Sequence, residues 1–84
     1  MKWTVDYLNE AVRQEVWALP NDMRAGIVRN AEMIEAVGLE RVGMPYVRHV
    51  RGKLWEIHAT GRDGIAEASM LPCQNAVSLF SGHL

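Results

Sequence analysis

The chain has 84 residues, a formal net charge of −1 and one cysteine, which together favour a single domain with a thin hydrophobic core. The near-neutral charge excludes a general attraction to nucleic acid or membranes, and Cys73 alone excludes an internal disulfide or a cysteine-based metal cluster, which suits a cytoplasmic protein. No apolar run reaches the roughly 20 residues of a membrane span, and Asp6 and Glu10 interrupt any signal-peptide core, so no membrane role is expected.

The chain begins with a pattern typical of a strand that leads into a helix. Residues 2–8 alternate between apolar and polar side chains, and this predicts a half-buried strand with Trp3, Val5 and Tyr7 on its apolar face. Asn9 is expected to cap the helix that follows. The apolar stripe of this helix is expected to comprise Leu8, Val12, Val16 and Leu19.

A second helix follows after a short connection. Pro20 ends the first helix, and either Asn21 or Asp22 can cap the second. The predicted apolar stripe of the second helix comprises Met23, Ile27, Ala31, Ile34 and Val37. Gly38 is a natural stop for this helix, because glycine readily takes a positive φ.

The second half of the chain predicts two strands joined by a turn. Residues 42–52 read as an irregular crossing marked by Gly43 and Pro45. Residues 53–59 alternate again, with Trp55, Ile57 and Ala59 on one face and Leu54, Glu56 and His58 on the other. The stretch "TGRDG" is a turn, and a strand is expected to return from Ile65.

The end of the chain differs from the rest in composition. All nineteen charged side chains precede Ala68, and residues 68–84 carry none. Residues 76–80 could form a further strand, but no polar residues alternate through them. We therefore expect one domain over residues 1–84 that includes an atypical tail over residues 68–84.

Basic residues gather in the middle of the chain. Only Glu56 is acidic between Arg41 and Arg62, a segment that also holds Arg48, His49, Arg51, Lys53 and His58. A positive surface with two imidazoles suits a phosphodiester ligand, since cations neutralise phosphates and histidine can transfer protons. The alternative, which composition alone favours, is a solvated face balanced by glutamates on the helices.

Neither candidate histidine suggests a metal site. His58 lies on the polar face of its predicted strand and His49 lies in the irregular segment, so exposed and inert side chains are the default. Neither has a histidine, cysteine or carboxylate at metal-ligand spacing, so no metal is expected. The chain has no phosphate-binding loop and no dinucleotide glycine pattern, and no cofactor is expected. Trp17 is interpreted as a partner contact or a flank of the core.

Two segments carry a family resemblance. "VRQEVWALPNDMRAGIVRNAEMIEAVG" and "GMPYVRHVRGKLWEIHATGRDGIA" resemble the phage-derived, HigB-like toxin family of the RelE/ParE superfamily over about residues 2–67. The most specific part is "KLWEI" followed after three residues by "GRDGIA", with "LP" upstream between the two helices. The resemblance implies an α+β fold in which two N-terminal helices pack on a small, mainly antiparallel, RelE-like sheet.

The same resemblance implies a function. Such toxins belong to type II toxin–antitoxin pairs, and they typically cut mRNA, often on the translating ribosome, with basic and polar residues and no metal. The implied partners are mRNA, the ribosome and a cognate antitoxin with a helix-turn-helix domain. The alternatives are a catalytically inactive toxin that only binds its antitoxin, and a gyrase-directed toxin.

The resemblance also indicates site residues. Lys53 and Arg62 match basic positions of the family motif, and Glu56 and Asp63 match acidic ones. His58 stands where the family usually has arginine, and Glu67 stands where a basic or aromatic residue is common. The predicted catalytic residues are Arg62, Lys53 and His58, and the predicted RNA-binding residues are Arg48, His49 and Arg51.

The tail departs from the family. Members continue through two more strands into a basic "F-x-K-K-T" segment and a final helix, whereas "SMLPCQNAVSLFSGHL" has neither the lysines nor the alternation. Loss of that segment favours an inactive toxin. The DNA from Ser69 onward can also be read in the frame that starts at the third base of each codon. One translation that the genetic code permits in that frame is "YVAVPERRLAVLRAF", which has two strands, a turn with two arginines and a final phenylalanine, as the family does. We therefore hypothesise a frameshift, with a divergent natural tail or a deliberate change as the alternatives.

Overall fold

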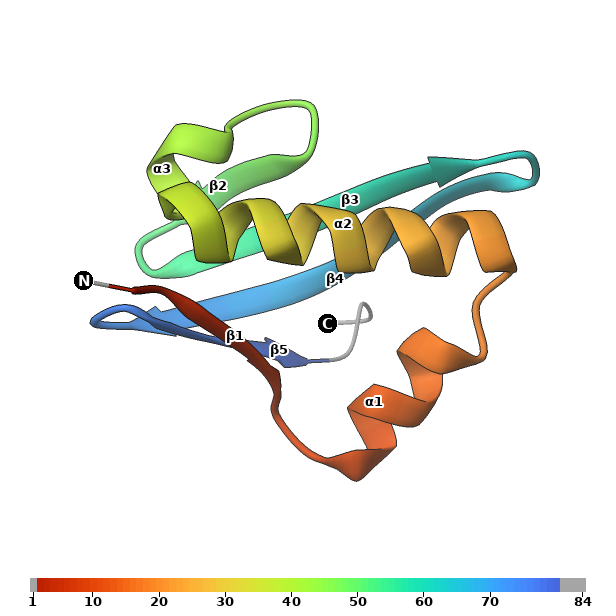
Figure 1. The fold of residues 1–84 in the computed structure, drawn as a ribbon, viewed down its shortest axis with the longest axis horizontal. Helices are drawn as coiled ribbons and strands as arrows, with labels where there is room; N and C mark the ends of the chain where they lie inside the picture. Colours follow the sequence, from red (N-terminus) through yellow and green to blue (C-terminus); the bar gives the residue numbers. More distant parts are fainter. Residues whose placement is uncertain (1, 81–84) are drawn as a thin grey trace.

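The computed structural model describes residues 2–80, which form an α+β fold with three helices and one sheet of five strands (Figure 1). The helices are α1 Glu10–Trp17, α2 Asn21–Val37 and α3 Leu39–Val42; the strands are β1 Thr4–Tyr7, β2 Val47–Arg51, β3 Leu54–Gly61, β4 Gly64–Cys73 and β5 Ala76–Phe80. The sheet order is β1-β5-β4-β3-β2, and β1 is parallel to β5 while the other pairs are antiparallel. The expected fold class, with N-terminal helices packed on a mainly antiparallel sheet, is confirmed.

Two of the predicted helix ends, Asn9 and Gly38, are found in the structure. Asn9 caps α1, because its Oδ1 accepts a hydrogen bond from the Val12 amide at 3.0 Å. Gly38 ends α2 with a φ of 89°. The expected side-chain cap of α2 is wrong: Pro20 occupies the N-cap position, and the carboxylate of Asp22 accepts hydrogen bonds from the amides of Met23 and Arg62 instead.

The hydrophobic core lies between α2 and the inner face of the sheet. Helix and sheet approach closely at Gly26, where a Cβ atom would lie 2.7 Å from the Cβ of Ala59. The predicted inward face of residues 53–59 is confirmed, because Ile57 and Ala59 are buried and Trp55 packs against the core. Two ends of the predicted helical stripes are wrong, since Leu8 and Val37 are exposed. The largest fully buried side chains are Ile27, Ile34, Leu39, Ile57, Met70, Val47 and Val77.

The segment between α2 and β3, which was expected to be irregular, contains a helix and a strand. Residues 39–42 form the short helix α3, and β2 begins at Val47 and pairs antiparallel with β3. Val47 is buried, so its side chain anchors this edge strand to the core. A slip of the register between His49 and Arg51 precedes the turn into β3.

The uncharged tail completes the sheet. Residues 68–73 continue β4, and β5 lies between β4 and β1, with Val77 and Leu79 buried and Ala76 exposed. The possible strand over residues 76–80 is therefore found, and burial alternates along it although polar residues do not. The fold of the tail therefore does not support the frameshift hypothesis, which stays a prediction about the DNA. No helix within residues 2–80 is long and apolar enough to cross a membrane.

Candidate active site on the open face of the sheet

Polar side chains from three strands gather on the face of the sheet opposite α2. Ile57 is buried beneath α2, so Glu56 and His58 on either side of it point to the other face. The strand register places Arg48 of β2 opposite Glu56, and it places Glu67 of β4 opposite His58. The four side chains therefore form one row across β2, β3 and β4.

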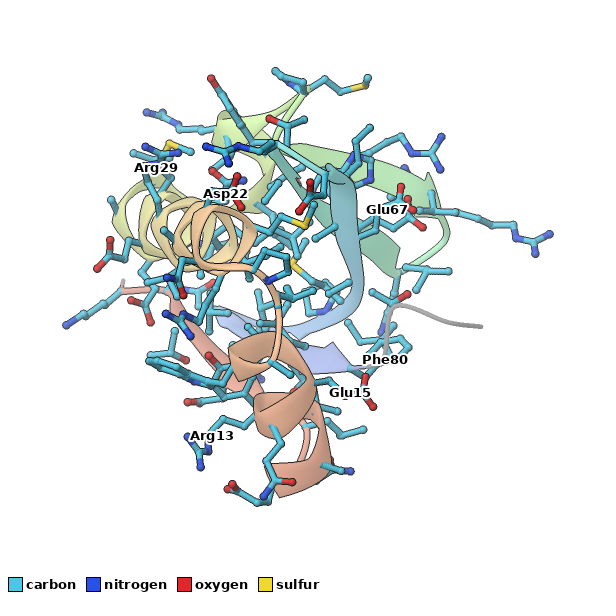
Figure 2. The ribbon with its side chains drawn as sticks, turned by 90° about the vertical axis from the view of Figure 1, so that its right-hand side faces the viewer. Arg13, Glu15, Asp22, Arg29, Glu67 and Phe80 are labelled. Carbon is cyan, nitrogen blue, oxygen red and sulfur yellow. The ribbon has the colours of Figure 1, made fainter. Side chains whose placement is uncertain are left out.

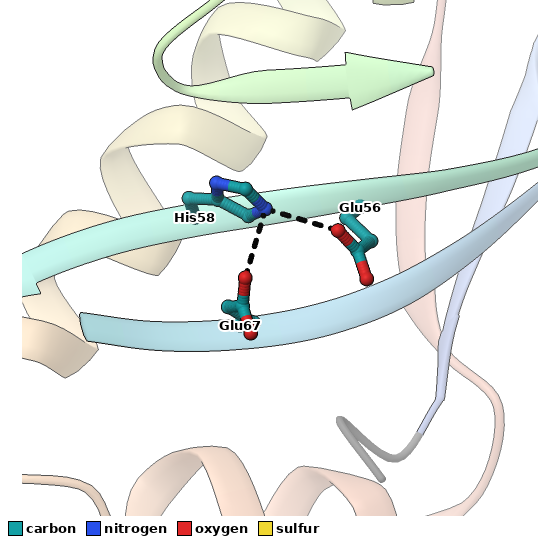
Figure 3. Close-up of side chains that lie close together, drawn as sticks. All are labelled: Glu56, His58 and Glu67. Atoms are coloured by element: carbon teal, nitrogen blue, oxygen red, sulfur yellow. Dashed lines mark hydrogen bonds and ion pairs between the residues drawn. The ribbon is translucent and has the colours of Figure 1, made fainter. Parts of the chain in front are cut away.

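The imidazole of His58 lies between two carboxylates (Figure 3). Its Nε2 atom is 3.2 Å from Oε1 of Glu56 and 3.3 Å from Oε2 of Glu67. We call Glu56, His58 and Glu67 the Glu–His–Glu cluster. Nη2 of Arg48 lies 3.1 Å from the same Oε1 atom of Glu56, so this guanidinium extends the row at its β2 end. Glu67 is the most exposed member of the cluster, with 51% of its side chain accessible.

These contacts set the charge of the site. The hydrogen bond with His58 lowers the pKa of the Glu56 carboxyl group, burial opposes this effect, and Arg48 lowers the pKa further. Glu56 is therefore ionised at neutral pH. Since Nε2 of His58 faces carboxylate oxygens on both sides, that nitrogen is the donor, and a proton on it satisfies Glu56 and Glu67.

The three predicted catalytic residues do not share one site. Lys53 lies in the turn between β2 and β3, whereas Arg62 lies in the turn between β3 and β4. These turns are at opposite ends of β3, which has 8 residues and so a length of about 26 Å. His58 lies between them within the strand. A single catalytic step at His58 cannot use both Lys53 and Arg62 directly.

The predicted RNA-binding residues also divide between environments. Arg48 belongs to the row, and Arg51 is exposed at the end of β2. The ring of His49 instead lies 4.9 Å from that of Trp55, and its Nε2 atom lies 2.6 Å from the carbonyl oxygen of Gly52. His49 therefore has structural contacts at the β2–β3 turn, away from the Glu–His–Glu cluster.

Sequence reasoning missed the two carboxylates that flank His58. The expectation that His58 has no carboxylate at ligand spacing is wrong, because Glu56 lies two residues earlier on the same strand face. Glu67 becomes its cross-strand neighbour through the Gly61–Gly64 pair. The sequence contained both signals. Strand alternation places Glu56 on the face of His58, and Glu67 lies as many residues after Gly64 as His58 lies before Gly61.

The turn that carries Arg62 is fixed to the start of α2. The Arg62 amide donates to Oδ2 of Asp22 at 2.7 Å, and the Met23 amide donates to Oδ1 at 2.8 Å. The hydrogen bond from Arg62 lowers the pKa of the Asp22 carboxyl group, burial opposes this, and the Met23 amide contributes further. A side chain at Gly61 would disturb these contacts, because a Cβ atom would lie 2.7 Å from Oδ1 of Asp22.

A groove of about 600 Å³ opens beside the cluster, between α1 and β4. Its walls are largely apolar, and two glutamates lie on its lining, Glu15 from α1 and Glu67 from β4. Figure 2 labels these two residues and Phe80, the last residue of β5, which also lines the groove. Glu67 thus belongs to both the groove and the Glu–His–Glu cluster.

Trp17 lies outside the core, on the surface of α1. Its ring is half exposed, and the guanidinium of Arg24 lies over it at 4.9 Å from the ring centroid. This contact is a cation–π interaction between α1 and α2. Trp17 is therefore a surface residue that stabilises the helical hairpin.

Comparison with protein families identifies the lineage of the chain. The profile of the family described as phage derived protein Gp49-like (DUF891) matches residues 14–67, well over half of the chain. No curated protein and no solved structure was found to match. The matched segment contains α2, α3, β2, β3 and the whole Glu–His–Glu cluster. The chain belongs to the Gp49-like phage-derived family, a toxin-like family of the RelE/HigB-type toxin group.

Proposed function

We propose that this chain is the toxin of a toxin–antitoxin pair and that it cleaves mRNA at the Glu–His–Glu cluster without requiring a metal ion. One observation carries the proposal: an imidazole lies within hydrogen-bond reach of two carboxylates on an open sheet face, with a guanidinium in the same row. Carboxylate, imidazole and guanidinium are the groups that phosphodiester transfer needs for proton transfer and charge stabilisation. Membership of a toxin-like family supports the same function.

The chemical step is transesterification by the RNA itself. Glu67, the most exposed carboxylate, takes the proton of a ribose 2′-hydroxyl, and the 2′-oxygen then attacks the adjacent phosphorus. The bond to the 5′-oxygen breaks, and His58, acting as an imidazolium, gives that oxygen its Nε2 proton and becomes a neutral imidazole. The products are a 2′,3′-cyclic phosphate and a 5′-hydroxyl. Glu56 holds the imidazole in position through its 3.2 Å contact with Nε2.

The basic residues around the cluster suit the RNA backbone. Arg48 lies in the row and can turn from Glu56 to the transferring phosphate, because half of its side chain is exposed. Lys53 and Arg62 lie at the two ends of β3 and would contact phosphates on either side of the cleaved bond. A strand of RNA laid along β3 would meet a cation, the cluster and a second cation in turn.

The products and the growth phenotype test this function together. Expression of the chain without antitoxin should arrest growth, and the mRNA fragments should end in 2′,3′-cyclic phosphate and 5′-hydroxyl groups. A phosphatase-sensitive 3′-phosphate monoester formed without the cyclic form would contradict the transesterification. Arrest with intact mRNA and damaged DNA would instead favour a gyrase-directed toxin.

A second candidate function is an inactive toxin that only binds its antitoxin. The specific observation is that the groups of the row already contact one another: Arg48 pairs with Glu56, and Nε2 of His58 lies between two carboxylates. The groove beside α1 then offers the antitoxin a largely apolar surface. Normal growth on expression, together with binding to the product of an adjacent antitoxin gene, would support this candidate over the enzyme.

A further inference from the structure

We propose that the Glu–His–Glu cluster binds a divalent transition metal ion, with Zn²⁺ as the preferred ion, and that this ion inhibits the toxin. Binding itself follows from the geometry of the side chains. The inhibitory consequence rests on the proposed function, because it concerns the proton transfers assigned to the same atoms. Within residues 2–80, this group brings one imidazole and two carboxylates close enough together to share a metal ion.

The spacing of the ligand atoms fits a small metal ion. Zinc bonds to imidazole nitrogen and carboxylate oxygen are about 2.0–2.2 Å long, so neighbouring ligands in a tetrahedral or octahedral shell lie about 3.0–3.5 Å apart. Nε2 of His58 lies 3.2 Å from Glu56 and 3.3 Å from Glu67, and the three ligand atoms all fall within 4.8 Å of one another. A metal ion can therefore replace the shared proton with small side-chain movements.

The backbone holds these ligands in place. Glu56 and His58 point to one face of β3 because they are two residues apart, and Glu67 is the cross-strand partner of His58 in β4. The pair of strands is joined by a turn that Asp22 fixes to α2 through its bond to the Arg62 amide. Metal binding would not have to order a loop, and its cost in conformational entropy is small.

The donor set selects the class of metal. Magnesium prefers oxygen ligands and retains its waters, whereas an imidazole nitrogen favours zinc and its transition-metal neighbours. Two carboxylates balance the double positive charge of the ion. Arg48 opposes it, because its guanidinium lies 3.1 Å from the Glu56 oxygen that would become a ligand.

Zinc at this site would stop RNA cleavage. It would occupy Nε2 of His58, the atom that delivers the proton, and the carboxylate of Glu67, which accepts one. A bound ion would thus remove both proton-transfer groups at once. Zinc is in this way an inhibitor of the proposed reaction and supplies none of its chemistry.

Calorimetric titration of the purified chain with Zn²⁺ tests the binding. We expect one site, a loss of affinity of at least about tenfold in both His58→Ala and Glu67→Gln, and tighter binding in Arg48→Gln. The matched controls are His49→Ala and Cys73→Ser, which should bind as the parent does. Unchanged affinity in His58→Ala and Glu67→Gln, or loss of the site in any control, would overturn the proposal.

Inhibition is measured separately, with mRNA cleavage followed before and after addition of Zn²⁺ and then of a chelator. We expect loss of cleavage with zinc and recovery with the chelator. Zinc that binds but leaves cleavage unchanged would refute the inhibitory role. A chain that binds zinc at His58 and never cleaves RNA would refute the proposed ribonuclease while the metal site stands.

Discussion

Glu67 and His58 are cross-strand partners in the β3–β4 hairpin, and their side chains meet with Oε2 of the glutamate 3.3 Å from Nε2 of the imidazole. They lie on opposite sides of the hairpin turn, and the pairing register of the two strands brings them together. Glu56 completes the arrangement because strand alternation returns it to the same face. The chemistry that we propose thus depends on the register of one hairpin, and through it on the turn that Asp22 holds.

Removing the charge of Asp22 should lower stability in a pH-dependent way. The hydrogen bond from the Arg62 amide lowers the pKa of this carboxyl group in the folded chain. A group with a lowered folded pKa stabilises the fold above its unfolded pKa, and this contribution is lost as the pH falls through the folded value. Asp22→Asn should therefore lower the denaturation midpoint at pH 7, and the gap to the parent should close below about pH 4.

Urea denaturation at a series of pH values measures this gap, with Asp63→Asn in the same turn as the control. The control should stay close to the parent at pH 7. A gap between Asp22→Asn and the parent that stays constant from pH 7 to pH 3 would show that the ionised carboxylate is not what stabilises the turn.

Several features of the fold were predictable from local sequence patterns. Asn9 as a cap and the inward face of Ile57 follow from neighbouring residues, and both are found in the structure. The partner of Asp22 was not predictable in this way, because the Arg62 amide is 40 positions further along the chain. The position of Glu67 could have been predicted by counting the same number of residues from the turn on both strands. The cluster was therefore predictable from the sequence.

The tail was misjudged for a physical reason. β5 lies inside the sheet between β1 and β4, and its outward side chains are Ala76, Ser78 and Phe80, which carry no charge. Buried and outward side chains therefore alternate along β5, but charged and apolar residues do not alternate in its sequence. Val77 and Leu79 still point into the core as a regular strand requires.

Truncating a core side chain of the tail tests whether this segment belongs to the fold. Leu79 is 2% exposed, so Leu79→Ala should lower the free energy of unfolding by about 2–5 kcal/mol. Leu71→Ala, also in the tail, is the matched control, because Leu71 is 46% exposed and should cost less than about 1 kcal/mol. Equal effects of the two substitutions in urea denaturation would argue against β5 as a core strand.

The two cations at the ends of β3 should act in RNA binding and not in the chemical step. Their turns are separated by the whole strand, so neither Lys53→Ala nor Arg62→Ala should change kcat by more than a few-fold. Each should raise KM and reduce the slope of log KM against log salt by about 1, as expected for a lost phosphate contact. The measurement is steady-state cleavage of an oligoribonucleotide at several salt concentrations.

Arg13→Ala is the control for those two variants, because Arg13 pairs with Glu10 on α1 at 2.6 Å. It should leave both KM and its salt dependence unchanged. If Arg62→Ala instead slowed turnover at saturating RNA by about 100-fold or more, the chemistry would lie at the β3–β4 turn, and a site centred on His58 would be contradicted.

The central claim is that His58 transfers a proton in RNA cleavage, and the single-turnover cleavage rate of ribosome-bound mRNA tests it most directly. His58→Ala should lower this rate by about 100-fold or more, while binding to the antitoxin and the denaturation midpoint stay close to those of the parent. A His58→Ala chain that cleaves at the parent rate would contradict the assignment of the active site to the Glu–His–Glu cluster.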